Sequence, residues 1–185
     1  YIPYVCTAIH DGGQMRDDVL EKCSLSNYER WYEEDPHTAE FIGNFPIIVQ
    51  GCDSRFEYDL NRPPESAIYE EAWGKNVWST PLSESQKQRS LGKHHAFYEV
   101  FEALIQKLES KFKKCIVYDM HSYNWKRWDR PVPVFNIGSE KIDQEKFGAY
   151  VESWRNELSL IELGDIHNYT AINDVFYGRG YLLSF

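Results

Sequence analysis

The sequence predicts an α/β fold, a three-layer sandwich in which a mostly parallel or mixed central sheet lies between helices. Short apolar runs alternate with helical stretches along the 185 residues, and this order is typical of a parallel sheet covered on both faces. Two of the apolar runs, near residues 4–9 and 115–119, lead directly into a histidine. Apolar residues also recur at helical spacing over roughly 84–112, which predicts one long amphipathic helix.

Each predicted element follows from the local spacing of apolar residues. Short apolar or alternating runs bounded by turn residues are assigned to strands, and runs with helical periodicity to helices. Residues 55–60 are assigned to a strand because they alternate and stop at the turn Asn61-Arg62-Pro63-Pro64. In chain order, we predict a strand at 2–9, helices at 15–23 and 28–43 (interrupted by Pro36), strands at 45–50 and 55–60, a loop at 65–82, a helix at 84–112, strands at 115–119 and 134–137, and a helix at 141–158.

The composition is that of a globular protein. A length of 185 residues suits one domain, and a hydrophobic content of 42% is enough for a sizeable core. We therefore expect a single domain over residues 1–185. The chain starts at Tyr1 without a methionine and ends in an apolar run, so we expect it to be trimmed at both ends.

Charge and cysteine usage exclude several classes of protein. A net charge of −9 disfavours a non-specific nucleic-acid binder, which usually presents a basic face. No apolar run approaches the length of a membrane span, so we expect no membrane contact. The four cysteines show no Cys-x-x-Cys spacing and the sequence shows no signal peptide, which together favour a reducing compartment, the cytoplasm.

The candidate site begins with the two histidines that follow strands. His10 follows the run Tyr4 to Ile9, and His121 follows the run Cys115 to Met120. Open α/β folds place their ligands at the carboxyl edge of the sheet, and imidazole is the commonest metal-ligand side chain. The alternative is a structural role, because a lone histidine at a strand end is more often simply hydrogen-bonded. The pair alone does not identify a metal.

Two further motifs carry binding chemistry. An asparagine–arginine pair, Asn61-Arg62, offers an amide and a guanidinium fork that suits a carboxylate, and its alternative is a salt-bridged surface turn. The acidic run Glu33-Glu34-Asp35 can supply a metal carboxylate. Its alternative, a solvated acidic helix start, is the better interpretation for Glu33.

Adjacent histidines within the long predicted helix form a third motif. The side chains of His94 and His95 point about 100° apart on a helix, so at most one faces a given site.

Taken in order, these motifs resemble the N-formylglutamate amidohydrolase family from about residue 4 to about residue 183. The family is related to zinc carboxypeptidases and succinylglutamate desuccinylases, so the resemblance implies their phosphorylase/hydrolase-like sheet sandwiched between helices. The matching segments are Ala8-Ile9-His10-Asp11-Gly12, Arg30 to Thr38, Ser54 to Pro63 and Asp119-Met120-His121-Ser122-Tyr123-Asn124.

The resemblance implies a metal site and a substrate clamp. His10 and His121 match the zinc-binding histidines, and Asn61 and Arg62 match the pair that holds the substrate carboxylate. The carboxypeptidases carry a glutamate three residues after the first histidine, where this chain has Gly13. The third ligand must come from elsewhere.

The acidic residues give three options for that ligand. Asp35 is the first choice and Glu34 the second. Asp53 is the third, although we expect it to orient Arg55 instead.

The implied activity is zinc-dependent hydrolysis of the amide bond of an N-acyl amino acid, with N-formylglutamate as the type substrate. Arg16, Arg55 or His95 is expected to contact a second acidic group or the developing oxyanion. The resemblance also implies a catalytic glutamate beyond residue 185, for which Glu162 is a weak substitute.

Two other functions stay open. A degenerate relative would bind a small acidic ligand or a partner without turnover, and a purely structural domain would bind no metal.

Overall fold

The computed structural model describes residues 2–184 and confirms the predicted α/β class with a parallel-rich sheet. By compactness the chain divides into two units, the first ending at Tyr123 and the second beginning at Asn124. Each unit is described by itself.

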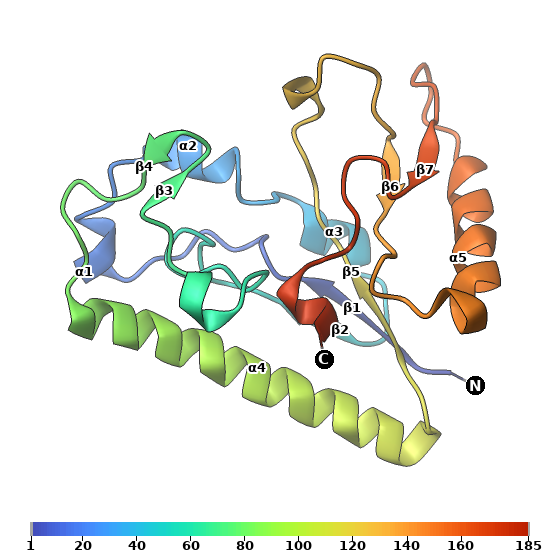
Figure 1. The fold of residues 1–185 in the computed structure, drawn as a ribbon, viewed down its shortest axis with the longest axis horizontal. Helices are drawn as coiled ribbons and strands as arrows, with labels where there is room; N and C mark the ends of the chain where they lie inside the picture. Colours follow the sequence, from blue (N-terminus) through green and yellow to red (C-terminus); the bar gives the residue numbers. More distant parts are fainter. Residues whose placement is uncertain (1, 185) are drawn as a thin grey trace. The chain divides into compact units, whose positions relative to one another are not determined.

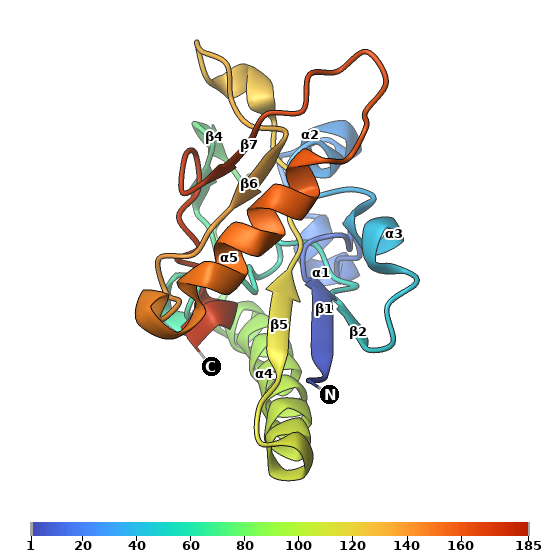
Figure 2. The ribbon, with the colours of Figure 1, turned by 90° about the vertical axis from the view of Figure 1, so that its right-hand side faces the viewer.

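The first unit is built on a parallel sheet of three strands in the order β2-β1-β5. The strands are β1 (Tyr4–Ala8), β2 (Ile48–Gln50) and β5 (Ile116–Asp119). Figure 2 shows β1 and β5 side by side and pointing the same way. Their register pairs Thr7 with Asp119, so both strands deliver the residues that follow them to one edge of the sheet.

Three short helices separate β1 from β2, namely α1 (Asp17–Leu20), α2 (Asn27–Trp31) and α3 (Thr38–Ile42). The helical stretch predicted over 28–43 is split between α2 and α3, because a residue that precedes proline is pushed away from helical geometry. That residue is Asp35, which precedes Pro36, so Asp35 lies in the break between α2 and α3 rather than inside a helix. α3 contacts β1 and buries its last residue against the sheet.

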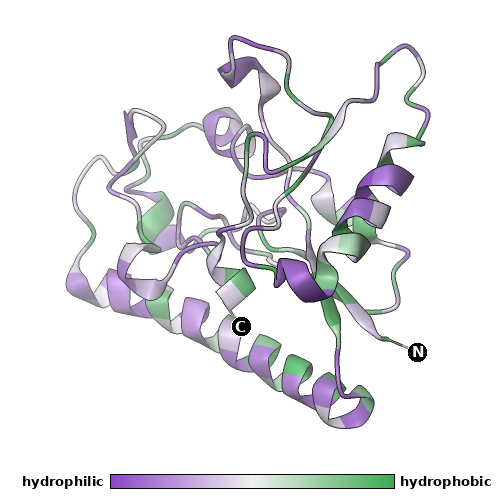
Figure 3. Ribbon diagram, turned by 45° about the vertical axis from the view of Figure 1, so that its right-hand side comes forward, coloured by the Kyte–Doolittle hydropathy of each residue, from purple (hydrophilic) through white to green (hydrophobic). Residues whose placement is uncertain are grey.

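The long helix α4 (Glu84–Phe112) matches the range predicted from its periodicity. Its first turn is closed by a capping box, in which the Ser83 side chain accepts from the Gln86 amide and Gln86 reaches back to the Ser83 amide. Figure 3 shows hydrophilic and hydrophobic stretches alternating along this helix, as expected for one buried face. The buried residues of this helix are Gln86, Ser90, His94, Tyr98, Phe101 and Leu108.

The strand predicted over residues 55–60 is wrong, because this segment forms turns. The amides of Glu57 and Phe56 bond to the carbonyl and the hydroxyl of Ser54, which curls the backbone. Alternation misled the prediction because the polar positions of the run are buried as well as the apolar ones: Glu57 and Asp59 are both 0% exposed. These two carboxylates are held by arginine side chains, a tertiary effect that no local pattern reveals.

The segment predicted as a loop over 65–82 contains a 3-10 turn at Pro64–Ser66 and a small antiparallel hairpin, β3 (Glu71–Ala72) and β4 (Lys75–Asn76). Figure 1 shows this hairpin in green near α2. The hairpin belongs to an apolar cluster whose buried members are Val19, Phe56, Tyr69, Val77, Trp78 and Leu82.

The second unit pairs two parallel strands, β6 (Phe135–Ile137) and β7 (Thr170–Ile172), and packs helix α5 (Gln144–Ser159) against both. The predicted strand at 134–137 and helix at 141–158 are therefore confirmed within a few residues. Short 3-10 turns at Trp125–Arg127 and Tyr181–Ser184 lie near its two ends.

Candidate metal centre

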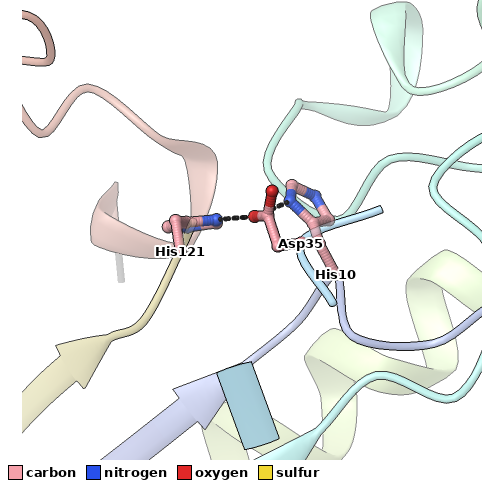
Figure 4. Close-up of side chains that lie close together, drawn as sticks. All are labelled: His10, Asp35 and His121. Carbon is pink, nitrogen blue, oxygen red and sulfur yellow. Dashed lines mark hydrogen bonds and ion pairs between the residues drawn. The ribbon is translucent and has the colours of Figure 1, made fainter. Parts of the chain in front are cut away.

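The two strand-end histidines meet at the carboxyl edge of the first sheet. His10 follows β1 and His121 follows β5, and the centroids of their rings lie 5.0 Å apart. Figure 4 shows the two imidazoles arriving from neighbouring strands and pointing toward a shared carboxylate. The parallel pairing of the two strands produces this meeting, because it sends both chains out at the same edge.

The shared carboxylate belongs to Asp35. Its Oδ2 lies 2.7 Å from Nδ1 of His121 and 3.3 Å from Nδ1 of His10. One ligand atom from each of the three residues lies within 4.8 Å of the others. Two imidazole nitrogens and one carboxylate oxygen form a donor set that zinc accepts. We call His10, Asp35 and His121 the cluster.

Each imidazole of the cluster is held from behind by a second carboxylate. Nε2 of His10 lies 2.7 Å from Asp59 Oδ1, and Nε2 of His121 lies 2.8 Å from Asp119 Oδ2. When a ring donates its Nε2–H to a carboxylate, its Nδ1 is left as a lone pair directed at the cluster. Both rings therefore have the orientation that metal binding needs, and loss of the proton that His121 carries in the metal-free protein leaves its Nδ1 free to bind a metal.

The two supporting carboxylates have different surroundings. Asp59 is fully buried, receives Nη2 of Arg55 at 2.8 Å and accepts the backbone N–H of Asn61 at 2.6 Å. Asp119 instead accepts the hydroxyl of Thr7 at 2.5 Å. One carboxylate is thus balanced by a positive charge and the other by a neutral donor.

The electrostatics favour a positive charge at this place. Burial alone would raise the pKa of the Asp35 carboxyl, but its hydrogen bonds to His10 and His121 outweigh burial and hold that pKa well below its usual range. Burial would lower the pKa of His121, but the neighbouring Asp119 and the bond to Asp35 raise it to about 10. In the metal-free protein, the protonated imidazole of His121 supplies a positive charge that balances the nearby carboxylates.

The other two carboxylates considered for the metal are engaged elsewhere. Glu34 accepts the hydroxyl of Ser54, and burial raises the pKa of the Glu34 carboxyl. Asp53 accepts the hydroxyl of Tyr58 and pairs with Lys93 at 2.9 Å. The expectation that Asp53 orients Arg55 is therefore wrong.

Arg55 is oriented by Asp59 and lies beside the cluster. Its Nη2 donates to Asp59, and its Nη1 lies 3.8 Å from Asp35 Oδ1. Its Nε is buried and has no hydrogen-bond partner among residues 2–184.

The predicted substrate pair also lies in this unit. The guanidinium of Arg62 is exposed and lies over the ring of Tyr69 at 4.8 Å. It lines a depression of about 200 Å³ that is also lined by the β3–β4 hairpin. The amide oxygen of Asn61 is buried and, within the described part of the chain, has no hydrogen-bond partner.

Two predicted residues, Arg16 and His95, are not brought to the cluster by the contacts they make. Arg16 is engaged by Glu57 at 2.7 Å and by Ser90 at 2.8 Å. His95 is 74% exposed and pairs with Glu99, while its neighbour His94 is the buried one of the two.

Glu162 belongs to the second unit, where it is exposed in the segment after α5.

Sequence reasoning missed some of the supporting residues. Asp119 was visible as the acidic neighbour of His121, but the neighbour of His10, Asp11, accepts from Gln50 instead. The true partner of His10 is Asp59, which lies 49 positions away, so only the fold brings the two together.

Gly12 permits this crowded approach of segments. A Cβ at Gly12 would lie 2.1 Å from the Cys52 carbonyl carbon, so any larger residue would push the two loops apart.

Among the described residues, no helix is long and apolar enough to cross a membrane.

Comparisons with known proteins bear on the fold and on the family of the chain. The fold is similar to that of a gene product from Agrobacterium tumefaciens in a crystal structure, with a TM-score of 0.64 and 19% sequence identity. The match covers 95% of this chain and 69% of the other chain. At this identity the similarity concerns the fold alone. Comparison with curated proteins gave no match. A family model for N-formylglutamate amidohydrolase matches residues 2–181, and the chain therefore belongs to the N-formylglutamate amidohydrolase family.

Proposed function

We propose that this protein is a zinc-dependent hydrolase that cleaves the amide bond of N-acyl amino acids, with N-formylglutamate as the type substrate. The observation that carries the proposal is the cluster of His10, Asp35 and His121 at the sheet edge of a chain from an amidohydrolase family. We extend the proposal to a three-layer, carboxypeptidase-like arrangement of the whole fold. The four free thiols support a cytoplasmic location.

The residues present fit a zinc ion. Both imidazoles direct Nδ1 at Asp35 Oδ2, while Asp59 and Asp119 hold Nε2 of each ring. Three protein ligands of this kind are typical of catalytic rather than structural zinc sites. When bound, zinc supplies a Lewis acid for the amide carbonyl and lowers the pKa of a bound water toward about 7.

The chain's own residues bind and orient the substrate. Arg62 is the exposed guanidinium next to the depression, and it holds the substrate carboxylate in a bidentate way. Asn61 contributes its buried side-chain oxygen as an acceptor for the substrate N–H. Arg55 keeps its buried Nε–H available for the carbonyl oxygen as negative charge develops there.

The proposal also needs a residue that accepts a proton from the attacking water. His95 is left out of the proposal because its exposed side chain pairs with Glu99. Glu162 stays a proposed proton acceptor, and the variant Glu162→Gln tests it. Loss of kcat with unchanged zinc content supports this role, and unchanged kcat removes it.

Formate release from N-formylglutamate by the zinc-loaded protein tests the proposed function. We expect turnover that a chelator abolishes and added zinc restores. Binding of the substrate without turnover would favour the alternative of a binding module. A protein that binds neither zinc nor substrate would contradict the proposal and favour a structural domain.

A further inference from the structure

The tip of the β3–β4 hairpin places a tryptophan where tryptophan is unfavourable. The two residues between the strands, Trp73 and Gly74, both have positive φ, at 51° and 75°. Two-residue turns of this kind favour asparagine or glycine, because a bulky side chain at positive φ is strained. Such strain persists where the surrounding contacts enforce it, and it is concentrated at functional sites.

Contacts of the Trp73 ring hold the strained turn. The ring packs edge-on against Phe56 at 5.7 Å and Tyr69 at 6.0 Å, measured between centroids. The guanidinium of Arg55 lies over the Trp73 ring at 5.1 Å. The side chain nevertheless stays 43% exposed, so its contacts leave a large aromatic surface open to solvent.

That surface lines the depression beside Arg62. The depression has a volume of about 200 Å³ and is lined by Arg62, Tyr69, Glu71, Ala72 and Trp73. This volume is below the range of sites that bind drug-sized ligands, so the depression suits a small group. A guanidinium on one wall and an indole on another suit an anionic group carried on a short apolar stem.

Arg55 connects this depression to the cluster. One face of its guanidinium covers Trp73, while its Nη2 donates to Asp59 and its Nη1 lies 3.8 Å from Asp35. Arg55 therefore contacts both Trp73, which lines the depression, and the carboxylates of Asp59 and Asp35.

We propose that Trp73 is a specificity-determining residue whose ring supports the side chain of the amino-acid half of the substrate, while Arg62 holds the carboxylate. The inference rests on the proposed function for the identity of the substrate. It adds that the Trp73 ring contacts the unbranched, apolar part of the substrate side chain, so that substrate affinity depends on the length of that part. The strained turn is the structural requirement for placing the indole there.

A binding series in the metal-free protein tests the inference. The ligands are the N-formyl derivatives of alanine, 2-aminobutyrate and norvaline, each longer than the last by one methylene. Calorimetric Kd values should fall by about fourfold per methylene in the parent, because each buried methylene is worth about 0.8 kcal/mol. In Trp73→Asn this dependence on length should vanish, and in Trp73→Phe it should be partly kept.

The variants are chosen so that the turn survives. Asparagine accepts positive φ readily, so Trp73→Asn removes the ring without opposing the backbone. Trp31→Asn is the matched control, because Trp31 is 47% exposed on α2 and does not line the depression. It should keep the parent's length dependence. Thermal unfolding of each variant shows whether the fold is retained.

The outcomes separate this inference from the proposed function. Equal length dependence in the parent and in Trp73→Asn overturns the inference, as does a parent that shows no binding or no length dependence. If the length dependence is lost only in Trp73→Asn but the zinc-loaded parent releases no formate, the inference stands and the proposed function fails. Formate release with no role for Trp73 leaves the proposed function standing alone.

Discussion

The two histidines of the cluster differ in what balances their supporting carboxylates. Asp59, behind His10, is compensated by the positive charge of Arg55 at 2.8 Å. Asp119, behind His121, accepts the hydroxyl of Thr7 and pairs with the imidazole of His121. Although burial lowers it, the pKa of His121 is raised to about 10 by the charge and hydrogen bond of Asp119 and by the bond to Asp35.

Removing either imidazole should remove most of the metal. We expect His10→Ala and His121→Ala each to lower bound zinc from about one equivalent to a small fraction, because a site with two remaining ligands loses chelation. Elemental analysis of the purified variants provides the measurement. His95→Ala is the control, since that ring is exposed and pairs with Glu99. Unchanged zinc in both cluster variants would rule out the site.

Replacing Arg62 with lysine should weaken substrate binding. A lysine ammonium keeps the charge but cannot reproduce the two-pronged contact of a guanidinium with a carboxylate. We expect KM to rise by about tenfold with little change in kcat, the pattern of a contact that is equal in ground and transition states. Steady-state kinetics with N-formylglutamate measure it.

The control for that substitution is Arg89→Lys, because Arg89 is an exposed arginine paired with Asp18 on α4. It should leave KM unchanged. A lysine at position 62 that binds as well as the parent arginine would contradict the carboxylate clamp.

At the scale of elements, the capping box of α4 is a separable source of stability. Ser83→Ala removes the hydroxyl that accepts from the Gln86 amide, and loss of such a cap costs about 1 kcal/mol. For a protein of this size we expect Tm to fall by roughly 2–4 °C. Calorimetry measures the shift, with Ser85→Ala as control, because Ser85 lies exposed inside the first turn. Equal Tm values for the two variants would show that the cap contributes nothing.

The elements that the sequence predicted well are those with a long local signal. The approximate range of α4 was predicted because its apolar spacing is a local signal that runs through the whole helix. The segment 55–60 was missed because two of its polar residues are buried in ion pairs with Arg16 and Arg55. The β3–β4 turn was missed because Trp73 is a residue that the turn chemistry disfavours.

How much of the site could be predicted depended on how far apart the interacting residues lie in the sequence. His10 and His121 were visible because each directly follows a strand-like run, and Asp35 was the first choice within the acidic run Glu33-Glu34-Asp35. The pairing of His10 with Asp59 had no local signal. The arrangement as a single domain over residues 1–185 stays a prediction, as does zinc.

At the scale of the molecule, zinc affinity should depend on pH. In the metal-free protein His121 carries a proton below its raised pKa of about 10, and zinc must displace that proton. The affinity should therefore rise with pH through the neutral range, by up to about tenfold per pH unit while one proton is released. Competition with a chelator of known affinity at pH 6, 7 and 8 measures the slope. A Kd that is constant after correction for the chelator would contradict the raised pKa.

The pairing of Thr7 with Asp119 has a consequence for how the site comes into being. These side chains are 112 positions apart, with α4 between them, so the contact closes a very long loop of chain. Contacts between residues this far apart form late in folding. Closing so long a loop costs conformational entropy, and structure that has already formed between the two residues reduces that cost. The strand register that joins Thr7 to Asp119 also sets which face of the sheet each side chain occupies, and a slip of one residue would send Asp119 to the opposite face. The cluster thus assembles only in chains in which β1 and β5 have paired in this register, so the zinc binding proposed above would report on completed folding.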